Sequence, residues 1–112
     1  MRLIRVGEEP QQLFTILNNG FEITLELRYL PVAEQWIMNV TYSGRTINGV
    51  KLSIGVLHMD SQGYPFDFYV RGALGFGIDP YRLSDFQDGR CELYLIEPDE
   101  IEELRGYPVE IL

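Results

Sequence analysis

Few residues of the types that perform catalysis occur in this sequence. His58 is its only histidine and Cys91 its only cysteine, which excludes any site that needs two of either. A Cys–His dyad would require these two side chains to meet. Cys91, however, begins an alternating apolar segment, and small buried thiols are common in protein cores. We therefore expect no reactive dyad and predict that the protein is not an enzyme.

The acidic and glycine-rich segments also lack the spacing of known sites. Glu22 and Glu26 lie about 13 to 14 Å apart on one strand face, too far for paired glycosidase carboxylates. The Gly75-Phe76-Gly77 segment has no third glycine and no following helix, so it does not match a dinucleotide site. A metal centre would have to bring together the carboxylates of Asp79, Asp85, Asp88 and Glu92. Their spacing does not follow that of a calcium-binding loop. We expect no cofactor.

Composition restricts the class of protein and its partners. The length of 112 residues predicts one domain over residues 1–112, and the hydrophobic fraction of 46% and aromatic fraction of 12% predict that it is ordered. The net charge of −8 repels phosphate backbones, and the nine basic residues are spread singly, so nucleic acid is not an expected partner. No signal-peptide pattern opens the chain, and no apolar run approaches the roughly 18 residues of a membrane span. We expect cytoplasmic synthesis and no membrane partner.

Residues 21–29 are the segment around which the elements are organised. Apolar or aromatic side chains occupy the odd positions and polar ones the even positions. Because successive strand side chains point to opposite faces, this pattern predicts a long strand with one buried face. A helix would scatter the same apolar residues around its cylinder.

Two partner strands are predicted beside this long strand. Residues 12–17 precede it, and Asn18-Asn19-Gly20 between them is a strong hairpin signal because Asn and Gly tolerate positive φ. Residues 36–42 follow it, and an antiparallel hairpin would place Trp36, Met38 and Val40 on the buried face. This shared face is the predicted core.

The remaining segments predict an all-β fold. A short helix is expected over residues 97–106, with Pro98 in its first turn and Gly106 after its last. Further strands are expected over residues 3–6, 46–56 (interrupted at Asn48-Gly49), 66–70 as an irregular or edge strand, and 91–96. We predict a mostly antiparallel, compact β-barrel or sandwich with one short C-terminal helix. Barrel and sandwich demand the same alternation, so both stay open.

Aromatic residues are concentrated late in the chain. A core of this size does not easily bury all of them, and aromatics are enriched at protein interfaces, so we predict an interface here. A second small core under the loop is the alternative. The candidate interface residues are Tyr64, Phe66, Phe68, Tyr69, Phe76, Tyr81 and Phe86.

The order of these segments resembles the small baseplate plug proteins of contractile-tailed bacteriophages. The resemblance covers nearly the whole chain, rests on the order of strands, turns and acidic helix, and includes no chemically distinctive motif. It is weakest over residues 66–86. The segments that match are residues 1–4, 10–14, the Asn19-Gly20 turn, and residues 25–29, 36–40, 49–52 and 93–101.

The resemblance implies a non-enzymatic virion component. It would be a plug at the centre of the tail baseplate that seals or joins the tail tube, beside the hub and spike and next to tube or wedge proteins. Several symmetric copies, three around the tail axis, are implied, and the acidic surface would suit basic partner surfaces. The alternative function is a free-standing β module that binds a carbohydrate or peptide through the aromatic, glycine-rich segment.

Overall fold

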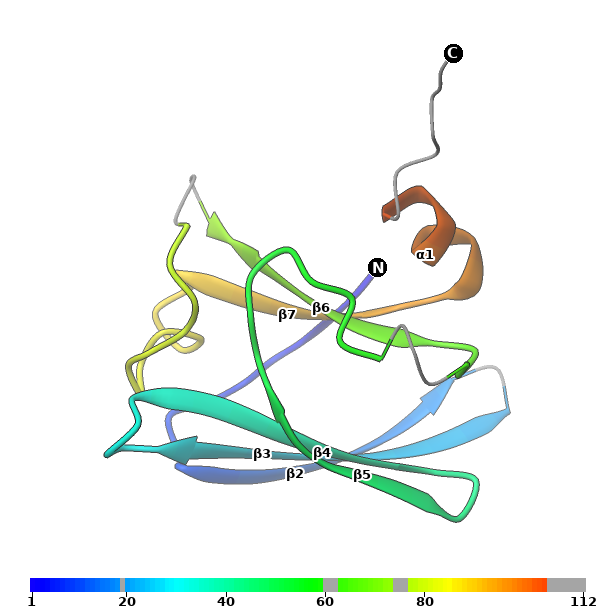
Figure 1. Cartoon of the computed structure of the whole chain (residues 1–112), viewed down its shortest axis with the longest axis horizontal. Helices are drawn as coiled ribbons and strands as arrows, with labels where there is room; N and C mark the ends of the chain where they lie inside the picture. Colours follow the sequence, from blue (N-terminus) through cyan, green and yellow to red (C-terminus); the bar gives the residue numbers. More distant parts are fainter. Residues whose placement is uncertain (19, 60–62, 74–76, 105–112) are drawn as a thin grey trace.

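The computed structural model describes residues 1–18, 20–59, 63–73 and 77–104 and confirms the predicted all-β class (Figure 1). Strands that pair antiparallel dominate the chain, and one short helix follows them. The elements are β1 (Arg2–Ile4), β2 (Gln11–Asn18), β3 (Phe21–Leu30), β4 (Gln35–Tyr42), β5 (Arg45–Lys51), β6 (Asp67–Gly72), β7 (Cys91–Ile96) and α1 (Pro98–Leu104).

The strands form two sheets that face each other as the layers of a sandwich (Figure 1). The larger sheet has the order β2-β3-β4-β5, and the smaller has the order β1-β7-β6. No ladder within the described ranges closes the two sheets into a barrel, so the structure selects the sandwich from the two predicted architectures. Residues 52–59 cross from β5 to the smaller sheet, where Ile54 forms an isolated parallel bridge with Val70.

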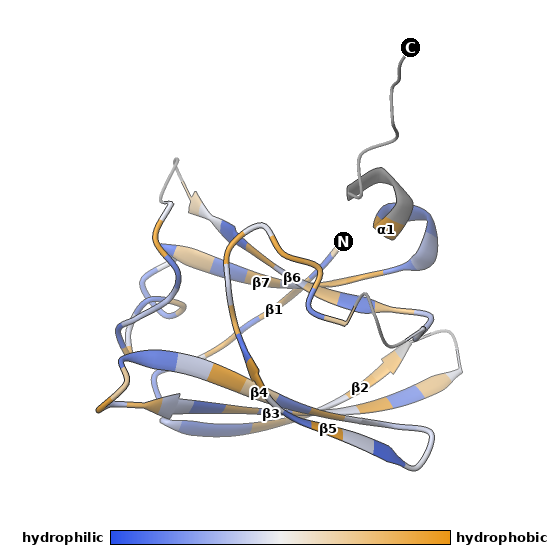
Figure 2. Ribbon diagram, in the orientation of Figure 1, coloured by the Kyte–Doolittle hydropathy of each residue, from blue (hydrophilic) through white to orange (hydrophobic). Residues whose placement is uncertain are grey.

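The register of β3 against β4 builds the predicted buried face. Leu25 lies opposite Val40, Leu27 opposite Met38, and Tyr29 opposite Trp36. Each apolar side chain therefore packs beside another in the cross-strand pairs that stabilise sheets. Leu25, Leu27, Trp36, Met38 and Val40 are all fully buried, and the alternation with polar residues is visible along both strands in Figure 2. The predicted core is confirmed.

Polar side chains link all four strands on the opposite face of the larger sheet. Gln11 Nε2 and Asn39 Nδ2 both donate to the Glu26 carboxylate, at 2.6 and 2.9 Å, and Asn39 Oδ1 accepts from the Gly49 N–H at 2.8 Å. The bond from Asn39, and then the bond from Gln11, lower the pKa of Glu26. Glu26 and the exposed Glu22 are thus surface residues of one strand, as the alternation indicates.

The hairpins follow the predicted turn chemistry. Asn18 pairs with Phe21, and Gly20 has a φ of 82°, which glycine adopts without the steric cost of a side chain. Asn19 lies outside the described residues. The predicted interruption at Asn48-Gly49 is also confirmed, because the β4–β5 register shifts here and Gly49 has a φ of 73°.

Two predicted strands end earlier in the structure than their sequence patterns indicate. The strand predicted over residues 46–56 ends at Lys51, because the chain leaves the larger sheet after Leu52 to reach the second layer. The predicted opening strand over residues 3–6 is β1, which stops pairing after Ile4 as the chain turns towards β2. The strand predicted as an edge over residues 66–70 is β6, which does lie at an edge of its sheet.

β7 and α1 complete the fold. β7 is the central strand of the smaller sheet, and its consecutive residues Leu95 and Ile96 are both buried, so the end of this strand is covered on both faces. α1 begins at Pro98, one residue after its predicted start; Ile101 is buried, and the Met1 amino group contacts Glu100. Gly106, its predicted end, is outside the described residues. No helix in the described ranges is long and apolar enough to span a membrane.

Truncation of the β3 core tests how far the sandwich depends on this strand. Leu27→Ala is expected to lower the free energy of unfolding by about 2–5 kcal/mol, because it leaves a cavity at a fully buried site. Urea unfolding followed by tryptophan fluorescence measures the change. Val32→Ala is the matched control, because Val32 is 99% exposed and its loss should change stability by no more than about 0.5 kcal/mol. Equal effects of the two substitutions would contradict this account of the core.

Candidate interaction surface

The aromatic residues predicted as one interface do not lie on one surface. Phe66, Phe68 and Phe86 are buried within the chain, so their rings are covered by the chain's own side chains. Tyr64, Tyr69 and Tyr81 are half-buried and keep part of their surface accessible. Phe76 lies outside the described residues. The accessible part of the predicted interface is therefore the three tyrosines, and their role in partner binding stays a prediction.

One group of rings packs at the end of the sandwich where β3 begins. Tyr42 contacts Tyr64 and Phe66 with ring centroids 5.3 and 5.1 Å apart. Phe21 also contacts Tyr42, with ring centroids 5.5 Å apart. Arg45 lies over the Tyr64 ring at 5.4 Å. The three ring pairs formed by Tyr42 have the edge-to-face geometry that aromatic pairs favour. The group packs against the main core and closes one of its ends, so these rings do not form a separate second core.

A second group lies at the opposite end of β3. Trp36 contacts Tyr29 and Phe86 with ring centroids 5.5 Å apart in both pairs. The loop that carries Tyr81 is bonded across this end, because the Tyr29 hydroxyl donates to the Tyr81 carbonyl at 2.7 Å and Trp36 Nε1 donates to Arg82 O at 3.1 Å. Eight positions along β3 separate Phe21 from Tyr29, roughly 27 Å at 3.4 Å per residue. The described rings therefore form no single ligand platform.

Buried Asp85 holds the loop at this second end. Its Oδ2 accepts the N–H groups of Tyr81 and Arg82 at 2.9 and 3.0 Å, and its Oδ1 lies 3.6 Å from Arg90 Nη1 and 3.8 Å from Arg82 Nε. A buried carboxylate with these partners orders the backbone around it. Asp85 is thus a structural anchor of this loop.

Tyr69 lies on an accessible sheet face together with residues that the aromatic pattern alone did not select. Leu3 of β1 and Tyr69 of β6 both lie opposite Tyr94 of β7, so the three side chains form a row across the smaller sheet. Leu3 is 41% exposed and both tyrosines are half-buried. We call this surface, with Arg71 and Glu92 beside it, the outer tyrosine face. The alternation of β7 contains the signal for Tyr94, because it faces away from buried Leu93 and Leu95.

Hydrogen bonds fix the polar part of the outer tyrosine face. Arg71 Nη2 donates to the Tyr94 hydroxyl at 2.7 Å and to Glu92 Oε1 at 3.2 Å, and its guanidinium carbon lies 5.0 Å from the Tyr94 ring centroid. The Tyr94 hydroxyl donates to the same Glu92 oxygen at 3.0 Å. Burial and then the Glu92 bond raise the pKa of Tyr94. An ordered aromatic row with a charged border resembles the core and rim of protein interfaces.

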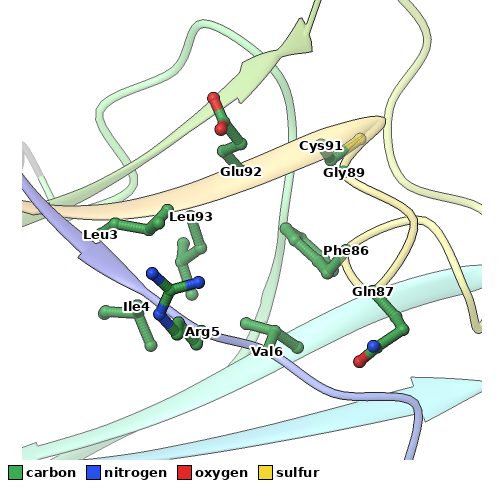
Figure 3. A pocket seen from close by; sticks show the side chains of 10 residues that line it. All are labelled: Leu3, Ile4, Arg5, Val6, Phe86, Gln87, Gly89, Cys91, Glu92 and Leu93. Atoms are coloured by element: carbon green, nitrogen blue, oxygen red, sulfur yellow. The ribbon is translucent and has the colours of Figure 1, made fainter.

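A pocket of about 300 Å³ opens where β1 separates from β7 (Figure 3). After Ile4 the chain no longer pairs with β7. Figure 3 shows Phe86 between β7 and the Arg5–Val6 segment. Arg5, Gln87 and Glu92 contribute charged and polar groups beside the apolar side chains of the lining.

The only histidine and the only cysteine have structural environments. The N–H of Ser53 donates to His58 Nε2 at 2.9 Å, so the ring proton is on Nδ1, which donates to Phe68 O at 2.8 Å. Burial lowers the pKa of His58, which keeps the ring neutral. Burial, with Asp85 and Asp79 nearby, raises the pKa of Cys91 to about 12. Both ring nitrogens of His58 thus hold the crossing segment, and the Cys91 thiol stays protonated at neutral pH.

Three of the four acidic residues considered for a metal centre, Asp79, Asp85 and Glu92, have separate partners. Asp79 accepts the Ile54 N–H at 2.9 Å and lies 3.5 Å from Lys51 Nζ, whereas Glu92 is bonded to Arg71 and Tyr94. Among the described residues, no group of three or more His, Cys, Asp or Glu side chains is placed to hold a metal ion.

The fold is a small sandwich whose buried charged and polar residues stabilise loops and crossings. The family model of the cyanophage baseplate Pam3 plug gp18 matches residues 1–98, from the start of β1 to the first residue of α1, and the chain belongs to this family. This confirms the resemblance to phage baseplate plug proteins. The chain is a structural component of a baseplate in the virion tail. No curated protein matches the sequence.

The neutral state of His58 predicts a pH-dependent stability. The pKa of His58 is lowered in the folded state, whereas the unfolded chain keeps the ordinary value of about 6.5. Below that value the unfolded state binds more protons than the folded state. The free energy of unfolding should therefore decrease as the pH is lowered from about 7 to about 5. Urea unfolding across this range measures it. His58→Gln removes the titrating group and should weaken the dependence; the same slope in both proteins would show that His58 is not its source.

The protonated, buried state of Cys91 predicts chemical inertness. The folded protein should resist alkylation by iodoacetamide at mildly alkaline pH, because the thiolate is the reacting species. The same reagent should modify Cys91 once guanidinium unfolds the chain, as intact-mass spectrometry would show. Rapid modification of the folded protein would indicate an accessible thiolate and revive the possibility of cysteine chemistry.

Proposed function

We propose that the chain is a plug at the central hub and spike of a contractile tail baseplate, where it seals or joins the tail tube. The observation that supports this position most directly is the family match over residues 1–98, which includes both sheets. In this proposal the protein occurs in symmetric copies, three around the tail axis. Its partners are hub and spike proteins, with tube or wedge proteins adjacent, and neither nucleic acid nor membrane.

The surface chemistry is consistent with this role. A net charge of −8 favours docking against basic surfaces, through complementarity that accelerates association and selects partners. The outer tyrosine face offers one partly apolar contact area, because Leu3, Tyr69 and Tyr94 lie abreast. We assign this face to contact with the hub, and the pocket beside β1 to an apolar side chain of the same partner.

The direct test is the solution mass of the purified protein, alone and mixed with the hub protein encoded beside it. We expect a stable complex of fixed stoichiometry, with three copies of this chain on the hub. A chain that ignores the hub and instead binds a carbohydrate or peptide as a monomer would contradict the plug proposal and favour the free-standing module.

Substitution on the outer tyrosine face tests the assigned contact. Tyr69→Ala should weaken hub binding about tenfold, because truncation of a central interface tyrosine typically costs more than about 1 kcal/mol. Calorimetry of the complex measures this change. Val32→Ala, in the turn between β3 and β4, serves as the control and should bind the hub like the unmodified chain. If Tyr69→Ala binds equally well, the hub contacts another face.

A further inference from the structure

β2 is an edge strand whose own residues lack the features that normally protect such strands. It lies at one end of the larger sheet and pairs only with β3 in the described part of the chain. The other edge strands carry charged residues: Arg2 in β1, Arg45 and Lys51 in β5, and Asp67 and Arg71 in β6. β2, with the sequence QQLFTILN, contains no charged residue, no proline and no bulge. Proteins usually blunt an exposed edge with such features, because its free backbone groups pair readily with another strand.

The accessible side of β2 is also unusually apolar. Leu13 and Leu17 are each 69% exposed, among the highest values for large apolar side chains in the described residues. Thr15 lies between them on the same outward face, since side chains alternate along a strand. The outward-facing row of β2 is therefore Leu13, Thr15 and Leu17, and its order of residue types is the same when the strand is read in the reverse direction.

The backbone of the same residues faces the free edge. The Tyr29 N–H donates to Pro10 O at 2.8 Å, so the even-numbered residues that follow in β2 bond to β3, and the odd-numbered ones point outwards. The Leu17 carbonyl confirms this direction, because it accepts a bond from Arg2 Nη1 of the other sheet at 3.0 Å. A carbonyl oxygen can accept a second donor, so this bond does not block the edge.

We propose that β2 is a self-association site, where it pairs antiparallel with β2 of a second copy around a twofold axis at Thr15. In this register Thr15 lies opposite its own counterpart, and Leu13 of each copy lies opposite Leu17 of the other. Two larger sheets become one continuous sheet, and the exposed leucines cover each other. Because the row is the same in both directions and uncharged, the partner that it fits best is itself. This inference concerns the free protein and does not depend on the position proposed in the baseplate.

The acidic charge of the chain does not oppose this register. The nearest carboxylates are Glu22 and Glu26 on β3, directly opposite Leu17 and Leu13. Across the pair they would be separated by three strand spacings, about 14 Å at roughly 4.8 Å each. This exceeds the screening length of about 8 Å at physiological salt, so their repulsion is weak.

The test uses residue 15, which a twofold axis places opposite itself. The unmodified chain should show a mass that rises towards twice that of one chain in a sedimentation-equilibrium concentration series. Thr15→Lys and Thr15→Glu should each remain single chains, because like charges would face each other across the axis. An equimolar mixture of the two variants should regain the double mass, because opposite charges then meet.

Val32→Lys is the matched control, because it adds the same charge at an almost fully exposed turn residue and should leave the double mass unchanged. Circular dichroism of each variant verifies that the fold is retained. A single-chain or three-copy mass for the unmodified protein would overturn the proposal. It would also be overturned if Thr15→Lys kept the double mass, or if the mixture failed to regain it. None of these results depends on the hub protein, so failure here leaves the plug proposal standing.

Discussion

The pairing of β3 with β4 is the constraint on which the rest of this structure depends. Their registered pairs place a continuous apolar row on one face, and Leu25, Leu27, Met38 and Val40 become fully buried. A single sheet cannot cover that row by itself, so the smaller sheet must pack over it. Phe68, Val70, Leu93 and Leu95 provide that cover and are buried in turn. Both layers therefore follow from one strand pair whose buried face needs a partner.

A few buried polar groups fix how the second layer is attached. The crossing segment between the sheets is bonded at three places: Asp79 to the Ile54 N–H, His58 to Ser53 and Phe68, and Asp67 to the N–H of Met59 at 2.8 Å. These bonds satisfy backbone groups that no strand pairs, where an unsatisfied buried group would be costly. The residue types that first suggest catalysis in this sequence thus serve the path of the chain.

This use of its polar residues accords with the role of a baseplate component. A protein that transmits contacts between other proteins needs a rigid body and distinctive surfaces rather than a reactive centre. Here the rings at the two ends of the sandwich stiffen the body, while the outer tyrosine face and the β2 edge present separate surfaces. A small sandwich can therefore offer one face to a partner and one edge to a copy of itself.

The sequence by itself determined the elements that rest on local chemistry. Period-two alternation predicted β2, β3, β4 and β7, and Asn-Gly predicted the first hairpin. Pro98, expected in the first helical turn, indicated the start of α1 to within one residue. Each of these signals acts within a few residues. Only the tertiary structure decided the sandwich over the barrel, the end of β5 at Lys51, and the division of the aromatic residues between two ends of the core. Those outcomes depend on which distant segments meet, as when Tyr29 bonds to Tyr81 and Leu3 lines up with Tyr69 across Tyr94. Alternation along a strand predicts which side chains share one face of the sheet, but it does not predict which other segment packs over that face.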